Sequence, residues 1–463
     1  MKRSTTIKLL LILFFSSIFS YSFYLTDYKI LNSSSIKDTY ISDETWYVSA
    51  SRNLLREAFH AFPRSPNATL QFKSVVDLAK FNGLYSSNFS FVKIEPYVKI
   101  KNAEYAIGRN VTKVFELIKE KDKYNLTIVQ PGWKYPDKEG ILNYLNLEHP
   151  PVGKYFIMYQ ILKKDVPMNW RIPSMLLGSL VILVLPVAIL LSTESFWLSF
   201  LTLLLLYFDE PLRVMSMIAM LDIYAASFSA MSFAALLFEP YSAALLYALA
   251  SSSKYTAFFY FLPIAYVFWL EKRKSPLGSF LRPLITFVLI LTLTSLPIIM
   301  GLGFQKWLKN LIGGIEWFLV SRPSGPPPST PWDWIMGTGK VPLSVKPTLE
   351  VYTNPTIMQL AIIAFFLLLP LRKRRLYRAP WLASLYLVSA LLGFQLVYWA
   401  GNHTLYAFYT VVFTPFADVA AAGLAISLMN YSHISEALQW WWNAIKTTWR
   451  WLWGKKRLEC KLV

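Results

Sequence analysis

Long uninterrupted apolar runs constrain this chain more than any other feature of its sequence. Several of them approach the ~20 residues that a helix needs to cross the hydrocarbon core of a bilayer. Apolar residues make up 55% of the 463 residues and charged residues only 16%, whereas a typical soluble domain carries about 25% charged residues. A soluble protein of this length would expose too much apolar surface. The sequence therefore predicts an α-helical polytopic membrane protein.

We expect about ten transmembrane helices. The first follows a short basic start, and no small-x-small cleavage site follows it, so we interpret residues 8–25 as an anchored span rather than a signal peptide. The remaining spans are predicted at 173–191, 195–208, 222–238, 241–253, 255–270, 280–301, 356–371, 380–399 and 405–428.

The placement of the positive charge indicates an orientation. A net charge of +19 is also typical of nucleic-acid-binding proteins, but many Lys and Arg residues stand in short clusters beside apolar runs, which argues against nucleic acid as a partner. The clusters at 271–274, 372–375 and 455–457 share one side under this count of spans, and the positive-inside rule assigns that side to the cytoplasm. We therefore expect a multi-pass protein of the cell membrane with both termini cytoplasmic. Its predicted regions are 1–25 (cytoplasmic start and first span), 26–171 (first external loop), 172–301 (transmembrane bundle), 302–355 (external Pro/Trp loop), 356–428 (C-terminal spans) and 429–463 (basic cytoplasmic amphipathic tail).

The first external loop is predicted to contain a small α/β subdomain. Apolar alternation over 89–100 indicates a strand, 111–120 is typical of a helix, and 125–129 indicates a second strand. We place the subdomain between about residues 60 and 140. N-glycosylation acceptor patterns begin in the loop at Asn32, Asn67, Asn88, Asn110 and Asn125, and another begins in a predicted external turn at Asn402.

An acidic pair, Asp43 and Glu44, lies just outside the first predicted span. Two interpretations stay open. Ser42 could cap a following helix that carries the pair in its first turn. Alternatively, a carboxylate at the outer membrane surface could face a lipid-linked substrate and act as a general base.

A second polar pair, Glu148 and His149, precedes a short apolar helix predicted at 155–162. That helix is too short to span, so we expect it along the outer interface. The pair could hold a divalent metal ion, although a hydrogen-bonded loop is the commoner explanation for such a pair.

Three further charged residues lie beside or within apolar runs. Asp222 is a functional candidate because an ionisable residue at membrane depth is costly. Arg213 could form an ion pair with an aspartate that stabilises a turn. Lys254 could extend its amine to the interface or hold a phosphate as a point charge.

The order of these motifs resembles the C-type glycosyltransferases, namely the protein O-mannosyltransferases and the lipid-modifying aminoarabinose transferases. The resemblance covers the chain from its N-terminus to about residue 270 and rests on DETWY, HPPVGK, WRIPSMLLG, MIAMLD and SSSKYTAFF, in that order. These enzymes take sugars from polyprenyl phosphates. The resemblance implies that Asp43 with Glu44 is catalytic, that Arg171 binds the donor phosphate, and that His149 and Asp222 belong to the site.

The implied reaction is an inverting transfer of a sugar, mannose by the resemblance, from a polyprenyl or dolichyl phosphate to an acceptor hydroxyl on the external face. Asp43 would deprotonate the acceptor, and cationic side chains would stabilise the charge on the leaving phosphate. Candidates for the phosphate are Arg171, Arg213 and Lys254. No cofactor is required, and a divalent metal could bind only through Glu148 or His149.

The chain departs from this family in two places. Relatives usually carry an Arg where this chain has Ser216 and Met217, and Arg213, one helical turn earlier, could substitute for it. The separation between Asp43 and His149 is longer than is usual, so residues 60–140 would be an insertion that governs acceptor choice.

Alternatives remain for the acceptor and for the class of protein. The acceptor could be a protein Ser/Thr, a membrane lipid or a growing glycan. A transporter with intramembrane charges at Asp222 and Lys254 belongs to another class. Transporters tend to carry internal repeats with interrupted helices, and this sequence shows no convincing repeat.

Overall fold

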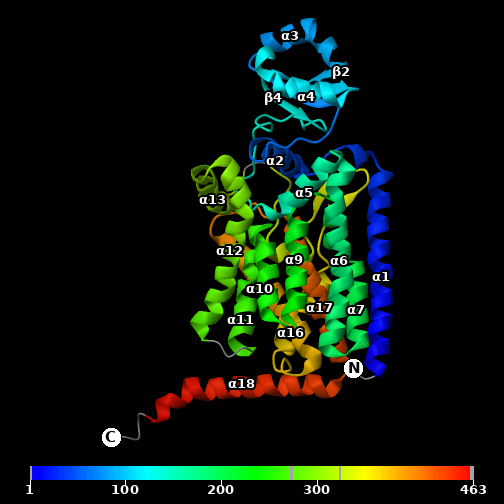
Figure 1. The fold of residues 1–463 in the computed structure, drawn as a ribbon. Helices are drawn as coiled ribbons and strands as arrows, with labels where there is room; N and C mark the ends of the chain where they lie inside the picture. Colours follow the sequence, from blue (N-terminus) through cyan, green and yellow to red (C-terminus); the bar gives the residue numbers. More distant parts are fainter. Residues whose placement is uncertain (1–2, 272–274, 323–324, 459–463) are drawn as a thin grey trace.

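The computed structural model describes residues 3–271, 275–322 and 325–458. The protein is mostly helical, with a bundle of roughly parallel helices and a small α/β lobe at one end of it (Figure 1). The first residues of α1 and the whole of α18 lie at the opposite end of the bundle (Figure 1).

Apolar helices build the bundle. Four are long and apolar enough to cross a membrane by length and composition: α1 (Arg3–Asn32), α6 (Pro167–Thr193), α12 (Pro276–Leu302) and α16 (Arg375–Trp399). Shorter apolar helices pack among them, namely α7 (Phe196–Tyr207), α9 (Leu221–Leu236), α10 (Pro240–Ser251), α11 (Phe261–Glu271), α15 (Pro355–Leu367) and α17 (Thr414–Leu428).

Two of the predicted spans are not single α-helices. Residues 255–270 begin as a 3-10 helix, η4 (Tyr255–Tyr260), and residues 405–428 contain η5 (Ala407–Val412) before α17. Prolines explain both breaks. Pro263 and Pro415 lie in the first turns of α11 and α17, where a missing N–H costs nothing, whereas the ring would clash with a preceding helical turn.

The segment predicted as an external Pro/Trp loop has regular structure of its own. It contains α13 (Phe304–Leu319), the short α14 (Pro331–Met336) and an antiparallel hairpin of β5 (Val341–Ser344) and β6 (Leu349–Val351). Thr330 starts α14 with a capping box, in which it exchanges hydrogen bonds with Asp333.

The α/β lobe is a four-stranded antiparallel sheet with the order β2-β3-β1-β4. Along the chain the elements alternate as β-α-β-β-α-β, the split βαβ arrangement. Leu70, Phe72, Phe81 and Leu117 belong to the core between the sheet and its helices. The elements are β1 (Ala68–Phe72), α3 (Val75–Leu84), β2 (Phe91–Pro96), β3 (Ala103–Gly108), α4 (Val111–Lys119) and β4 (Leu126–Pro131).

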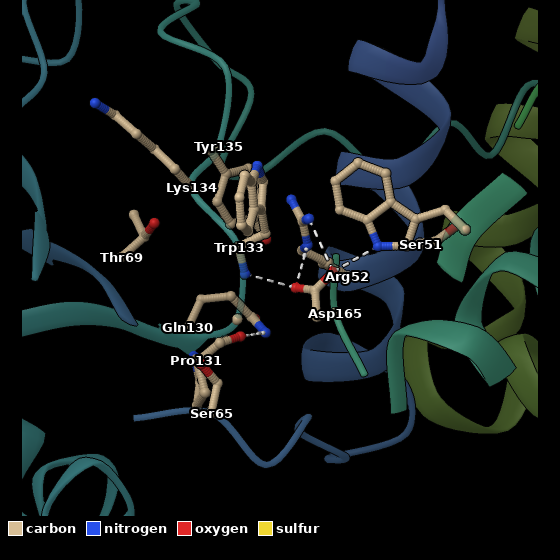
Figure 2. Close-up of polar contacts among 12 residues, drawn as sticks. Ser51, Arg52, Ser65, Thr69, Gln130, Pro131, Trp133, Lys134, Tyr135 and Asp165 are labelled. Carbon is tan, nitrogen blue, oxygen red and sulfur yellow. Dashed lines mark hydrogen bonds and ion pairs between the residues drawn. The ribbon is translucent and has the colours of Figure 1, made fainter. Parts of the chain in front are cut away.

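A buried ion pair docks the lobe onto α2 (Glu44–Glu57). The Nε and NH2 groups of Arg52 donate to the two oxygens of Asp165 at 2.7 and 2.9 Å, and the backbone N–H of Trp133, just after β4, donates to the same carboxylate at 2.9 Å (Figure 2). Asn53, the next residue of α2, donates to the carbonyls of Ile141 and Tyr144, both at 2.8 Å. Because these groups are buried and paired, the lobe is held in a fixed position above the bundle.

Candidate functional site

The two residues of the acidic pair point into different surroundings. Ser42 has a φ of +50°, and α2 begins at Glu44 with Asp43 in the N-cap position. Asp43 makes no side-chain capping bond, and Ser42 does not serve as the side-chain cap that the sequence allowed. The Asp43 carboxylate is therefore not used to cap α2.

Glu44 is fully buried and fully engaged. Arg171 on α6 donates to both of its oxygens, at 2.8 and 2.7 Å, and the backbone N–H groups of Ile41 and Ala219 donate at 2.8 Å each. Arg171 also donates to the carbonyls of Ile36 and Thr39. Glu44 and Arg171 thus hold α2, α6 and the segment before α9 together. Glu44 accepts four hydrogen bonds, and Arg171 donates four of its five N–H groups inside the protein.

Asp43 lines a cavity of about 570 Å³. Its other lining residues come from α2 and Ser42 before it, from the loop that follows β4, from the C-terminal end of α13 and the residues after it, and from η5 and the residue before it. The remaining lining is a mixture of aromatic rings and polar groups. The aromatic rings are those of Trp46, Tyr47, Tyr144, Trp317, Tyr406 and Phe408, and the polar groups include Lys138, Asn146, His149 and Arg322. A ligand there meets both flat apolar faces and hydrogen-bonding groups, which is the usual lining of a small-molecule site.

The Asp43 carboxylate lies among charges that shift its pKa, and no fixed partner among the described residues holds it. Burial raises the pKa of Asp43 above its usual value, Lys254 and Arg322 lower it, and Asp222 raises it. The Lys254 amine lies 2.7 Å from both oxygens of Asp222, so that pair neutralises its own charge. Asp43 is left as a carboxylate with a raised pKa, the property expected of a general base.

Arg322 is a site residue that the sequence analysis missed. Its guanidinium carbon lies 3.8 Å from the centroid of the Trp317 ring, and its Nε is buried without a hydrogen-bond partner. Among the ranges 3–271, 275–322 and 325–458, it forms no ion pair with an acidic side chain. Arg322 therefore offers guanidinium N–H groups to an anion in the cavity, where it also lowers the pKa of Asp43. No sequence motif marks it, since it lies between α13 and a Pro-rich stretch.

Glu148 and His149 do not lie together as metal ligands. The Tyr144 hydroxyl donates to Glu148, and so does the Asn146 amide at 2.9 Å. The His149 ring packs edge-on against Trp317 at 5.2 Å, and burial, helped by the charges of Lys254, Lys154 and Arg322, holds its pKa well below the usual value. Among the described residues no group of three or more His, Cys, Asp and Glu side chains could hold a metal ion.

The structure places the three predicted phosphate ligands differently. Arg171 is buried against Glu44, outside the cavity lining. Arg213 lies 3.7 Å from Asp27 on α1 and donates to the Tyr207 carbonyl at 3.0 Å, so its aspartate partner comes from another helix. Lys254, next to η4, is the one of the three that acts on Asp43 electrostatically.

Four of the six glycosylation patterns have exposed asparagines, namely Asn32, Asn88, Asn110 and Asn125. Asn67 is half-buried and accepts from the Gly108 N–H at 3.1 Å. Asn402 is 1% exposed and its amide donates to the Phe318 carbonyl at 2.8 Å, so the structure argues against it as an acceptor.

We expect a glycan at Asn88 and none at Asn402 when the protein is produced in a host that N-glycosylates external Asn-x-Ser/Thr sites. The reason is that an oligosaccharide can be attached only to an amide that is reachable and free of a buried partner. Asn88→Gln should increase electrophoretic mobility by one glycan, whereas Asn402→Gln should leave the number of glycans unchanged. Loss of a glycan in the second variant alone would contradict the burial of Asn402.

Comparison of the chain with protein-family models, with curated proteins and with solved structures finds no match to any of them.

Proposed function

We propose that this protein is a membrane glycosyltransferase that moves a sugar from a polyprenyl phosphate to an acceptor hydroxyl. The observation that carries the proposal is Asp43, a partly buried carboxylate without a side-chain hydrogen-bond partner among the described residues, on the wall of an aromatic-lined cavity that also holds the cation Arg322. The order of motifs in the sequence supports the same reaction, with mannose as the sugar that the resemblance implies.

In this proposal the bundle crosses the membrane about ten times, with the cavity and the α/β lobe external and both termini cytoplasmic. The four long apolar helices and the shorter ones beside them support membrane residence. Lys8, the basic run 372–375 and α18 (Tyr431–Leu458) are at the end opposite the lobe, which supports this orientation.

The proposed reaction uses this chain's own residues for proton transfer and charge stabilisation. Asp43 takes the proton of the acceptor hydroxyl as the oxygen attacks the anomeric carbon. The bond between that carbon and the phosphate oxygen breaks, and the configuration inverts. Arg322, which lines the cavity, stabilises the negative charge that develops on the leaving polyprenyl phosphate.

The cavity and a separate apolar groove suit different parts of such a donor. The rings of Trp46, Tyr47 and Trp317 offer flat faces for the apolar side of a sugar. The protein also has a separate apolar groove of about 450 Å³, lined by residues such as Phe258, Leu319 and Leu396. Leu319 precedes Arg322 by three residues in the sequence. A polyprenyl tail in this groove would place its phosphate beside that cation.

The acceptor class is a choice between a protein Ser/Thr and a lipid or glycan. The α/β lobe lies beyond α2 (Figure 1), the helix whose Trp46 and Tyr47 line the cavity, and buried hydrogen bonds connect the residues after β4 to α2. It is therefore in a position to select the acceptor, as expected for an insertion in the first loop. Transfer to a protein hydroxyl is our first proposal, and transfer to a lipid or a glycan is the second.

A direct assay tests the proposal. Purified protein in lipid nanodiscs is incubated with a polyprenyl-phosphate mannose and a peptide rich in Ser and Thr, and the released polyprenyl phosphate is measured by mass spectrometry. We expect release that depends on both the protein and the acceptor. Absence of release with peptide, lipid and glycan acceptors alike would contradict the proposed activity for this donor.

The rate of transfer should rise with pH across the titration of Asp43. The raised pKa means that the carboxylate is protonated at pH values where an ordinary aspartate, near 3.8, is already ionised. A protonated Asp43 cannot accept the hydroxyl proton, so kcat falls as pH drops through this raised value. A pH profile of kcat should show an acid limb with its midpoint above 3.8, and a rate independent of pH over that interval would argue against a titrating base.

Arg322→Gln should lower kcat/KM for the donor by about 10- to 100-fold, since a hydrogen bond to a charged group contributes roughly 1.5–3 kcal/mol. It should also move the acid limb to higher pH, because Arg322 lowers the pKa of Asp43. The matched control is Arg109→Gln, which removes an exposed arginine of the lobe. Equal kinetics for the two variants would remove Arg322 from the proposed phosphate site.

A further inference from the structure

The last helix of the protein, α18, runs across the end of the bundle rather than along it (Figure 1). It is 28 residues long, and its axis lies nearly perpendicular to the bundle helices (Figure 1). Its first part contacts them. His433 shares a hydrogen bond with the Tyr377 hydroxyl at 2.6 Å, Glu436 pairs with Arg374, and Trp441 donates to the Phe366 carbonyl at 2.9 Å.

An apolar stripe begins in this first part of the helix and continues beyond Trp441. Its members recur with spacings of four and three residues, so they share one face, and each is more than half exposed in the structure. The stripe consists of Leu438, Trp442, Ile445, Trp449 and Leu452.

The direction of the stripe follows from Trp441. This residue is three positions after Leu438 and four before Ile445, so it lies at the edge of the stripe, and it contacts the end of α15 through Phe366. That edge therefore faces the ends of the bundle helices. Gln439, Asn443 and Arg450 lie on another face of α18 and are exposed. Lys446 is also exposed and borders the stripe, with its amine 5.0 Å from the centroid of the Trp442 ring.

The charge of α18 and its surroundings is strongly positive. The helix sequence contains five Lys and Arg residues and one Glu, and the run 372–375, which supplies Arg374, is also basic. Trp and basic residues combined on a helix with an apolar stripe are typical of helices that lie in the headgroup region of a membrane with anionic lipids.

We propose that α18 binds the anionic phospholipid surface of the membrane leaflet at the bundle end opposite the cavity. The stripe enters the boundary between headgroups and acyl chains, and Lys446 and Arg450 remain at the level of the phosphates. This proposal rests on the membrane residence proposed above but not on the transferase activity, so a protein without that activity would still show it.

Spin labels on two faces of α18 test the proposal in the full-length protein. In a Cys460→Ser background, which removes the single cysteine of the sequence, a nitroxide is attached at Ile445→Cys or at Asn443→Cys. The protein is reconstituted in vesicles of phosphatidylcholine with phosphatidylglycerol. We expect the label at 445 to be exposed to oxygen and several-fold less exposed to the water-soluble relaxant Ni(II)EDDA than the label at 443.

Two further comparisons keep the test specific. Nitroxide labels at Trp442→Cys and Gln439→Cys repeat the comparison of the two faces at exposed positions about one helical turn earlier. In vesicles of phosphatidylcholine alone, or with Lys446→Glu and Arg450→Glu, the label at 445 should become more exposed to Ni(II)EDDA. Equal Ni(II)EDDA exposure on both faces would overturn the proposal, and so would labels shielded from both relaxants, which would indicate a protein partner. If the difference in Ni(II)EDDA exposure between the two faces stays the same in vesicles without anionic lipid, the proposed role of the positive charges is wrong.

Discussion

Asp43→Asn should lower kcat for sugar transfer by about 10²- to 10⁴-fold, the contribution of a positioned general base. The substitution keeps the size of the side chain and removes its ability to accept the acceptor proton. Because Asp43 has no fixed capping bond and its partial burial raises its pKa, the neutral amide should leave the protein as stable as the wild type or more so. Turnover and thermal unfolding of the same preparations check both statements.

The matched control for this variant is Asp38→Asn, which changes an exposed aspartate in the segment between α1 and α2. We expect it to transfer sugar at the wild-type rate. A correctly folded Asp43→Asn protein with the same kcat as Asp38→Asn would show that Asp43 is not the base. A parallel loss of folded protein would instead assign a structural role to Asp43.

The adjacent residue should behave in the opposite way. Glu44→Ala should lower the free energy of unfolding by about 3–5 kcal/mol, since it leaves the buried Arg171 without its counter-charge. Glu44 and Arg171 are both 0% exposed, so water cannot replace the lost partner. Denaturant unfolding of the detergent-solubilised protein measures this loss, and it is to be compared with Glu116→Ala, which removes one member of an exposed ion pair on α4 and should cost less than about 1 kcal/mol.

A double substitution separates lost charge pairing from lost packing. Glu44→Met with Arg171→Met removes both charges and keeps much of the volume, and such replacements of buried ion pairs are often close to neutral. The double variant should therefore be more stable than either single variant. If the double variant loses as much unfolding free energy as Glu44→Met and Arg171→Met lose together, the two residues do not act as a pair.

Much of the fold is predictable because apolar runs and strand alternation are local properties of the sequence. The short strand and helix signals at 89–100 and 111–120 correspond to β2 and α4. The strands β1 and β3 were missed because their burial depends on a sheet whose partners are distant in sequence. The breaks at η4 and η5 follow from prolines that a count of apolar residues ignores.

The candidate site is predictable only in part. The acidic pair is visible in the sequence, but its division into an engaged Glu44 and an unpaired Asp43 depends on Arg171 and Ala219, which are far along the chain. Arg171 was predicted to bind the donor phosphate, yet it donates hydrogen bonds to Glu44 and to the carbonyls of Ile36 and Thr39. Arg322 matches no motif, and only the packing of α13 brings it to the cavity.

The most direct test of the account asks which class of sugar donor the protein uses. Membranes that contain the wild-type protein or Asp43→Asn are incubated in parallel with a polyprenyl-phosphate mannose or with a nucleotide-linked mannose, and the glycosylated products are identified by mass spectrometry. The account predicts product from the lipid-linked donor with wild type, and about 10²- to 10⁴-fold less with Asp43→Asn. Product from the nucleotide-linked donor alone, or equal product from both proteins, would contradict it.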